Sequence, residues 1–527
     1  MERFEACCGN LLMAWGENPF IWHTVSITCC RLALNERDRG IIYENEPLLQ
    51  SKVGWYFFKI RKKMPKQDYS HILQKLRQEY HHHSPKSAAL QQQAKQVLVD
   101  GGSHTIRLIE PFPPRIRSAS GGYVTDEDSN QILDFWQGHY ANLLGHNPSV
   151  VTDALAQAFL QGNGLQTGFT DLHQAELATL LCQQTSAERV RFTTSGTLST
   201  MYAILLARAF TGREMVLKVG GGWHGAHLWG LKGVSHQAGF KQVDSVGVPD
   251  ELASDVIVSR FNDPQRLEDD FYENSGRLAC FIVEPVIGAG GMIPASREFL
   301  ETARRLCDQF GVVLIFDEVV SGFRYRAGDV GKLYGIQPDL LTMGKVIGGG
   351  MPVAAVGGRA EIMTLVGRDT GRKVKFSGGT YSGHPASMLA AKVFVQYLIE
   401  HESEIYPRLE KLSAEIRKKV PRVFSEAGIE ARFAGLDNDV LPNNSLHTLV
   451  IPYEGNNPLN SPNDVLDPER CDVDFVESVL KIAMLLEDVN IHHGLGAVST
   501  AHTLEDVDKL CLAFQAGLER IGSYQRR

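Results

Sequence analysis

Short, continuously apolar segments alternate with amphipathic segments through the middle of this chain. Three of the apolar segments are LACFIV at 278–283, VVLIF at 312–316 and LLTM at 340–343. Runs of this length are typical of strands buried on both faces, as in parallel sheets. Between the first two lies PASREFLETARRLCDQFG, 294–311, whose apolar residues recur at helical spacing. The alternation therefore predicts an α/β fold with a mostly parallel sheet covered by helices.

Each of these three segments is followed closely by an ionisable residue. Glu284 follows the first, Asp317 the second, and Lys345 the third after one glycine. Carboxyl ends of parallel strands lie at one edge of a sheet, where open α/β folds bind ligands. Taken alone, Lys345 could be a surface residue in the glycine turn that follows it, because lysine is rarely buried without a partner. Three charged residues at one edge favour a shared ligand site.

Two further stretches offer ligand-binding chemistry. Ser195, Gly196 and Thr197 form a polar turn that opens a helix, where free N–H groups, hydroxyls and the helix dipole suit a phosphate. An ordinary helix cap has the same composition. Downstream, Trp223 and His224 lie in a glycine-rich loop, which suits a flat ring stacking on a flat ligand, although such pairs also serve packing alone.

The combination of a phosphate turn, an aromatic platform, a carboxylate and a lysine is what pyridoxal phosphate chemistry requires. The Lys345 amine would form the Schiff base with the cofactor. Asp317 would pair with the pyridine nitrogen and keep it protonated, so that the ring can accept electrons from a carbanion. We therefore expect pyridoxal 5'-phosphate as the cofactor.

The sequence also resembles a known family, the class III aminotransferases of pyridoxal-phosphate fold type I, and within it the glutamate-1-semialdehyde 2,1-aminomutase-like branch. The resemblance covers roughly residues 100 to 520. The stretches that carry it are, in order, FTTSGTLSTMYAILLARAFTGRE, FIVEPVIGAGGMIP, LIFDEVVSGFRYRAG, PDLLTMGKVIGGGMPVAAVGGR, GGTYSGHPASMLAA and GAVSTAHTLEDVDKL. It implies a large domain with a mostly parallel, seven-stranded type of sheet covered by helices, plus a smaller α+β domain.

The resemblance implies a role for each matching residue. Lys345 matches the cofactor lysine, Asp317 the partner of the pyridinium, and Val319 the residue packed on the far face of the ring. Thr380 matches a threonine that reaches the phosphate of the neighbouring subunit, which implies a homodimer with shared active sites. The expected cofactor-binding residues are Ser195, Gly196, Thr197, Trp223, His224, Glu284, Asp317, Val319, Lys345 and Thr380.

The N-terminal arm of the same branch suggests substrate contacts. Arg107 is a candidate for holding a substrate carboxylate, because a planar guanidinium matches the two carboxylate oxygens. Arg324 is a weaker candidate that could be purely structural. In WQGHYANLLGH, residues 136–146, Trp136 and Tyr140 are expected to line the substrate side of the pocket.

Composition limits the other functions. The formal net charge of −8 and the absence of a basic, aromatic tract give no support to nucleic-acid binding. No cysteine spacing of the CxxC type predicts a metal, and scattered cysteines in apolar runs are typical of free thiols in a reducing compartment. Neither a secretory signal nor a membrane-spanning run is evident, so we expect a cytoplasmic protein without membrane contact.

Four segments are expected from these patterns. Residues 1–63 form an extension of uncertain structure, 64–148 the N-terminal arm and part of the small domain, 149–384 the large cofactor-binding domain, and 385–527 the C-terminal small domain.

The activity expected first is transamination between a small amino donor and a keto acceptor. Lys345 would act as the general base that moves the substrate proton. An aminomutase of the glutamate-1-semialdehyde type is the alternative within the family. A non-catalytic pyridoxal-phosphate-binding protein, which would have lost Lys345 or Asp317, is an alternative from another class. The aminomutases carry a glutamate in a context resembling EAGFVSxAHT where this chain has Gly494. That difference favours transamination, unless the loop alignment slips or another acid substitutes.

Overall fold

The computed structural model describes residues 41–45, 58–62, 67–236, 239–368, 371, 373–435 and 438–525. The chain divides into two compact units, Met1–Asp68 and Tyr69–Arg527. In the first unit, β1 (Ile41–Asn45) pairs with β2 (Phe58–Lys62) in antiparallel register. The rest of the extension predicted for residues 1–63 lies outside the described residues. Everything below concerns the second unit.

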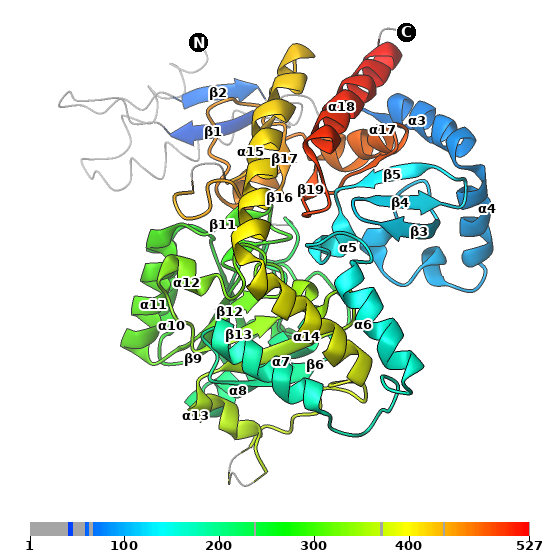
Figure 1. Ribbon diagram of the computed structural model, residues 1–527. Coiled ribbons are helices and arrows are strands. Elements are labelled where there is room, and N and C mark those ends of the chain that lie inside the picture. The colour runs from blue at the N-terminus through cyan, green and yellow to red at the C-terminus, as the bar shows by residue number, and fades with distance from the viewer. Residues whose placement is uncertain are drawn as a thin grey trace, which may run out of the picture. The chain divides into compact units, whose positions relative to one another are not determined.

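A seven-stranded sheet forms the centre of the second unit (Figure 1), which confirms the predicted architecture. Its order is β6-β14-β13-β12-β9-β7-β8. β14 runs antiparallel to both neighbours, whereas the pairs from β13 to β8 are parallel. The strands are β6 (Arg189–Thr193), β7 (Met215–Val219), β8 (Val256–Ser259), β9 (Leu278–Val283), β12 (Val313–Glu318), β13 (Leu340–Met343) and β14 (Ala354–Gly358).

Successive side chains of the central strands enter two different hydrophobic cores. Cys280 and Ile282 of β9 pack with Leu206 of helix α8 (Gly196–Thr211). Phe281 of the same strand packs with Phe299 of α11 (Arg297–Phe310) in the other core. Because side chains alternate across a strand, both faces of the sheet are buried. This explains the apolar runs in the sequence.

β12 extends further than the apolar run 312–316 predicts. Asp317 and Glu318 are the last two residues of the strand, paired in register with Thr342 and Met343 of β13. Asp317 therefore lies within the edge of the sheet instead of in the loop beyond it. Its carboxylate has buried hydrogen-bond partners, which makes a polar strand end possible.

A second, four-stranded sheet joins the two ends of this unit. Its order is β18-β5-β4-β3, with β3 (Ile116–Ser120), β4 (Tyr123–Asp126) and β5 (Gln131–Asp134) from the N-terminal arm. β18 (Val489–Asn490) comes from the C-terminal part and pairs parallel with β5. The N-terminal arm and the C-terminal region thus share one sheet. The boundaries expected at 148/149 and 384/385 fall inside one compact unit and stay predictions.

Helices and short elements complete the unit. α6 (Ser149–Leu160), α7 (Leu172–Gln184) and α14 (Pro385–Glu400) lie side by side (Figure 1). The remaining helices are α3 (Ser70–His83), α4 (Pro85–Ala94), η1 (Val99–Gly101), η2 (Thr105–Arg107), α5 (Gln137–Tyr140), α9 (Asp250–Ser254), α10 (Pro264–Asn274), α12 (Gly331–Tyr334), η3 (Lys345–Gly348), α13 (Ala360–Met363), η4 (Thr364–Val366), α15 (Glu402–Glu426), α16 (Pro462–Val465), the π-helix η5 (Phe475–Leu480), α17 (Lys481–Leu485) and α18 (Leu504–Gln525). The remaining strands are β10 (Val286–Ile287), β11 (Ile293–Pro294), β15 (Arg432–Phe433), β16 (Leu446–His447), β17 (Leu449–Val450) and β19 (Gly496–Ala497). Among the described residues, no helix has the length and apolar character needed to cross a membrane.

Candidate active site

Lys345 begins the short helix η3, and only Gly344 separates it from the end of β13. Its backbone φ is +41°, in the left-handed region that non-glycine residues seldom adopt and that is often found at functional sites. Burial lowers the pKa of the Lys345 ammonium, against the opposing charges of Asp317 and Glu284. A lysine with a lowered pKa is more readily available as a nucleophile or base.

Asp317 is buried and accepts three hydrogen bonds. Thr342 Oγ1 donates to Oδ1 (2.8 Å), Val319 N donates to Oδ1 (3.2 Å), and His224 Nδ1 donates to Oδ2 (2.8 Å). Burial opposes the charge of this carboxylate, but the hydrogen bonds, the one from His224 foremost, outweigh it and hold its pKa below the usual range. Asp317 is therefore ionised, as a partner for a protonated pyridine nitrogen must be.

His224 follows Trp223 in the glycine-rich loop and orients Asp317 through a hydrogen bond. Burial lowers the pKa of His224, so the ring is neutral, with its proton on the Nδ1 that donates to Asp317. Its Nε2 is buried and has no hydrogen-bond partner among the described residues. In this arrangement the histidine supports the aspartate.

Glu284 anchors the loop that carries Trp223. Its Oε1 accepts a hydrogen bond from Trp223 N (2.8 Å), and its Oε2 accepts one from Gly288 N (2.9 Å). Burial, together with the charge of Asp317, raises the pKa of Glu284 to about 8. Both of its oxygens are thus committed to the backbone, so in this structure Glu284 shapes the site.

A buried lysine that the sequence analysis did not single out holds the same loop from the other side. Lys218 Nζ donates to the carbonyl oxygens of Gly222 (2.9 Å), Gly230 (3.1 Å) and Lys232 (2.8 Å). Trp223 itself is 42% exposed, which leaves its ring open to a ligand. The only sequence signal for Lys218 is a charge inside the apolar strand β7.

Three segments meet at Val319. A Cβ added to Gly196 would lie 2.9 Å from Val319 Cγ1, and one added to Gly344 would lie 3.2 Å from the same atom. The start of α8, the end of β12 and the lysine turn therefore approach one another as closely as glycine allows. Ser195 caps α8 by accepting a hydrogen bond from Leu198 N (3.4 Å).

The loop of Trp223 also crosses the beginning of α8. Gly225 has a φ of +95°, and a Cβ there would lie 2.5 Å from Thr197 Oγ1. The predicted phosphate turn, the aromatic residue, the aspartate and the lysine are thus brought together by four separate segments. Thr380 is exposed, and a single chain does not test its expected contact with a neighbouring subunit.

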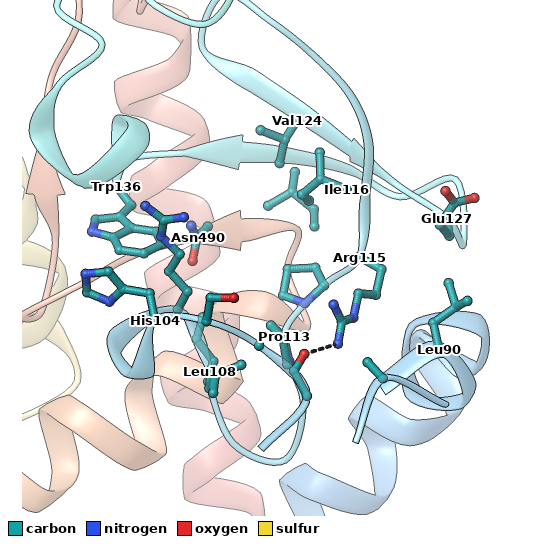
Figure 2. A pocket seen from close by; sticks show the side chains of 18 of the residues that line it. Leu90, His104, Leu108, Pro113, Arg115, Ile116, Val124, Glu127, Trp136 and Asn490 are labelled. Atoms are coloured by element: carbon teal, nitrogen blue, oxygen red, sulfur yellow. Dashed lines mark hydrogen bonds between the residues drawn. The ribbon is translucent and has the colours of Figure 1, made fainter. Parts of the chain in front are cut away.

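Arg107 and Trp136 line a cavity of about 940 Å³ together with His104 and Asn490 (Figure 2). Arg107 is exposed, so its guanidinium is accessible to a ligand. The apolar residues Leu108, Pro113, Ile116 and Val124 also line the cavity. Arg107 and Trp136 thus line one cavity, and their expected contact with a substrate stays a prediction.

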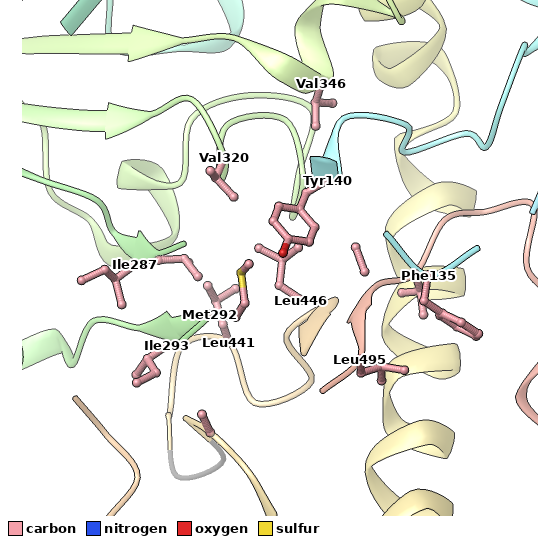
Figure 3. Close-up of a cluster of buried hydrophobic side chains, with 14 of the residues drawn as sticks. Phe135, Tyr140, Ile287, Met292, Ile293, Val320, Val346, Leu441, Leu446 and Leu495 are labelled. Carbon is pink, nitrogen blue, oxygen red and sulfur yellow. The ribbon is translucent and has the colours of Figure 1, made fainter. Parts of the chain in front are cut away.

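Tyr140 does not lie where the sequence analysis expected it. Its side chain is 4% exposed and packs in the apolar cluster beside Val346 and Leu446 (Figure 3). The reason is a left-handed turn at Gln137–Tyr140, which rotates the following side chains away from the positions of a regular helix or strand. The isolated Gly138 in WQGHY was the only sequence signal for this turn.

Arg324 has the structural role that the sequence analysis allowed. It is 1% exposed and donates to the carbonyl oxygens of Tyr140 (2.5 Å) and Val498 (3.4 Å). These bonds tie the left-handed turn to the C-terminal region, so Arg324 is not placed to meet a substrate directly.

The site fits pyridoxal 5'-phosphate. The N-terminal end of α8 offers N–H groups to a phosphate, Asp317 offers a charge to the pyridine nitrogen, and the open face of Trp223 offers stacking. Lys345 supplies the amine.

Comparisons with known proteins agree with this chemistry. The Aminotransferase class-III family matches residues 109–427. A glutamate-1-semialdehyde 2,1-aminomutase from Geotalea daltonii is 34% identical over 437 residues, covering 81% of this chain and 97% of the relative. Among solved structures, an omega-transaminase from Sphaerobacter thermophilus is 31% identical with a TM-score of 0.74, covering 82% of this chain and 97% of that one. A transaminase with bound pyridoxal phosphate is 29% identical with a TM-score of 0.73, covering 84% and 99%.

The fold and the match together define the class of protein. The chain belongs to the class-III aminotransferase family. It is an enzyme of pyridoxal-phosphate fold type I, with pyridoxal 5'-phosphate as its cofactor.

Proposed function

We propose that this enzyme is a two-substrate transaminase that moves an amino group between a small amino donor and a keto acceptor. The observation that supports this reaction, beyond the shared cofactor chemistry, is Gly494. It has a φ of +79°, and a Cβ there would lie 2.6 Å from Leu449 O. No acidic side chain can project from this position to retain an intermediate between two cofactor states.

The residues of the site support the following division of work. Lys345 would hold the cofactor through its amine and would move the proton at the substrate carbon. Asp317 would keep the pyridine nitrogen protonated, and His224 fixes the orientation of Asp317. The cofactor, when bound, would supply the electron sink. Glu284 and Lys218 hold the loop that carries Trp223.

An aminomutase is the second candidate. The curated relatives that the chain matches carry the name glutamate-1-semialdehyde 2,1-aminomutase, and these names favour the mutase over the transamination that the sequence analysis ranked first. The structure also offers an acid near the loop of Gly494. Glu477 Oε1 lies 3.0 Å from His493 Nδ1, one residue away from Gly494 in sequence. Glu477 is therefore the residue that could substitute for the missing glutamate.

A half-reaction screen separates the candidates. Amino compounds are mixed one by one with the holoenzyme, and the absorbance change of the bound cofactor reports amine transfer. Transamination predicts separable donor and acceptor steps with ping-pong kinetics. Formation of 5-aminolevulinate from glutamate-1-semialdehyde, at rates that match or exceed any transamination, would establish the mutase instead. No conversion by any amine would refute both.

We also propose a homodimer with shared active sites. Between α6 and α7 lies a set of exposed apolar side chains: Phe159, Leu160, Leu165, Phe169 and Leu172. Large exposed apolar surfaces mark interaction sites. Ala386 N donates to Gly164 O (3.1 Å), which places this segment beside the turn that follows Thr380. A second copy is the occupant that the predicted role of Thr380 requires.

We propose the cytoplasm as the location of the enzyme. In the described part of the chain, Cys182, Cys280, Cys307, Cys471 and Cys511 are unpaired thiols. Free buried thiols are typical of reducing compartments. Fractionation of cells followed by detection of the intact chain tests this.

A further inference from the structure

The turn Gln137–Tyr140 is the most strained backbone segment near the active site. Gln137, Gly138, His139 and Tyr140 have φ values of +48°, +61°, +65° and +68°. Consecutive left-handed residues are rare, because for a side-chain-bearing residue the Cβ then crowds the following carbonyl. Only one of these four is glycine.

Several hydrogen bonds keep this turn in place. Gln137 N donates to Asp134 Oδ2 (3.0 Å), and Gln137 Nε2 donates to Asp134 O (2.7 Å). Asn142 N donates to Gln137 O (3.1 Å), and Arg324 holds the carbonyl of Tyr140. A strained segment that is stabilised from several sides commonly serves a functional site. The question is which side chain the turn positions.

The turn sends Tyr140 into the core and His139 toward the site. The imidazole of His139 contacts His104 and Trp136, both of which line the cavity, with ring centroids 5.2 Å apart in each case. His139 is partly exposed. Gly138, the residue before it, lines the same cavity as Arg107, so His139 lies beside that cavity.

Two cationic side chains, Lys345 and Arg107, are among the groups that act on the pKa of His139. Burial lowers its pKa to about 3, and the charges of Lys345, His104, Arg107 and His493 act in the same direction. The short helix α5, which carries His139, also packs against η3, which begins with Lys345. His139 is thus a neutral hydrogen-bond donor in a region of positive potential, and such a region attracts an anion.

We propose that His139 binds the substrate carboxylate next to Lys345 and thereby selects amino acids over amines that lack a carboxylate. This inference rests on the proposed function for the identity of the reaction. The positive charge of Arg107 attracts the substrate carboxylate over a longer distance, and the neutral imidazole of His139 donates its N–H to a carboxylate oxygen.

His139→Gly is the informative variant, because glycine adopts a φ of +65° without strain and so preserves the turn while removing the imidazole. His82→Phe on the exposed face of α3 is the control, since His82 lies outside the site. The first measurement is calorimetric binding of succinate, a carboxylate that cannot react, to the protein without cofactor. We expect about 10- to 100-fold weaker binding in His139→Gly, the usual effect of losing a hydrogen bond to a charged group. Unchanged succinate binding in His139→Gly overturns the proposal.

The second measurement compares two amino donors of the holoenzyme that differ only in a carboxylate. His139→Gly should raise KM for the donor with the carboxylate about 10- to 100-fold, with kcat within a few-fold and KM for the matched amine unchanged. Equal increases in both KM values overturn the proposal, because they would show that His139 only shapes the turn. Succinate binding tests the role of His139 alone, because it does not depend on amine transfer. A failure of the proposed function would be seen separately, as an absence of conversion with every donor.

Discussion

Replacement of Gly494 tests the central steric argument. Gly494→Ala must hold alanine at a φ of +79°, which costs about 1–2 kcal/mol. It must also place a Cβ 2.6 Å from Leu449 O and 2.8 Å from Leu449 Cβ. Overpacking of this kind costs about 1–3 kcal/mol more. We therefore expect a loss of about 2–5 kcal/mol in the free energy of unfolding.

Gly428→Ala is the matched control for this loss. Gly428 has a similar φ of +75°, and a Cβ there meets nothing within 4 Å. We expect Gly428→Ala to lower the free energy of unfolding by about 1–2 kcal/mol, the cost of holding alanine in the left-handed conformation. Urea denaturation of the wild type and both variants, followed by circular dichroism, measures the difference. If Gly494→Ala is no less stable than Gly428→Ala, the loop can move away from Leu449, and position 494 could accept the glutamate of an aminomutase after all.

Four further predictions concern the chemistry of the site. Lys345→Ala should abolish turnover without loss of fold. Borohydride reduction of the wild-type holoenzyme should attach the pyridoxyl label to Lys345, and a label on another lysine would refute the assignment. Asp317→Ala should lower kcat by several orders of magnitude, because an unprotonated pyridine is a poor electron sink; near-normal steady-state rates would exclude this role. Thr380→Ala should weaken cofactor binding in equilibrium titrations if the site is shared between subunits, whereas sedimentation of a fully active monomer would contradict the dimer. Because the pKa of Glu284 is raised from 4.5 to about 8 in the folded protein, ionising it costs stability as pH rises through that interval. We therefore expect the free energy of unfolding of the wild-type apoprotein to fall between pH 5 and pH 8 relative to that of Glu284→Gln. An unchanged difference between the two proteins would mean that the Glu284 carboxyl is ionised throughout this pH range.

The proposals for Gly494 and His139 concern two different steps. The proposal for Gly494 concerns whether an acid can retain an intermediate, and the proposal for His139 concerns which substrates bind. Both residues lie on short segments with left-handed backbone conformations, where sequence patterns based on regular helices and strands carry little information. Both positions also depend on contacts with residues distant in sequence.

The sequence by itself determined the sheet and the place of three predicted site residues along it. Continuously apolar runs of strand length are typical of a sheet whose two faces are both buried. The positions of β9, β12 and β13 could therefore be predicted from these runs. Glu284, Asp317 and Lys345 then follow at one edge, because side chains at the ends of neighbouring parallel strands share that edge. These are local consequences of periodicity.

Only the tertiary structure decided what the remaining side chains do. Glu284 is committed to the backbone of the Trp223 loop, and Lys218 to three carbonyl groups of the same loop. Tyr140 enters the core and the His139 ring packs against His104 and Trp136 because four successive residues adopt left-handed conformations that distant partners stabilise. No local pattern encodes such a turn. Each left-handed residue of the turn costs conformational energy, and only contacts formed in the folded chain offset this cost.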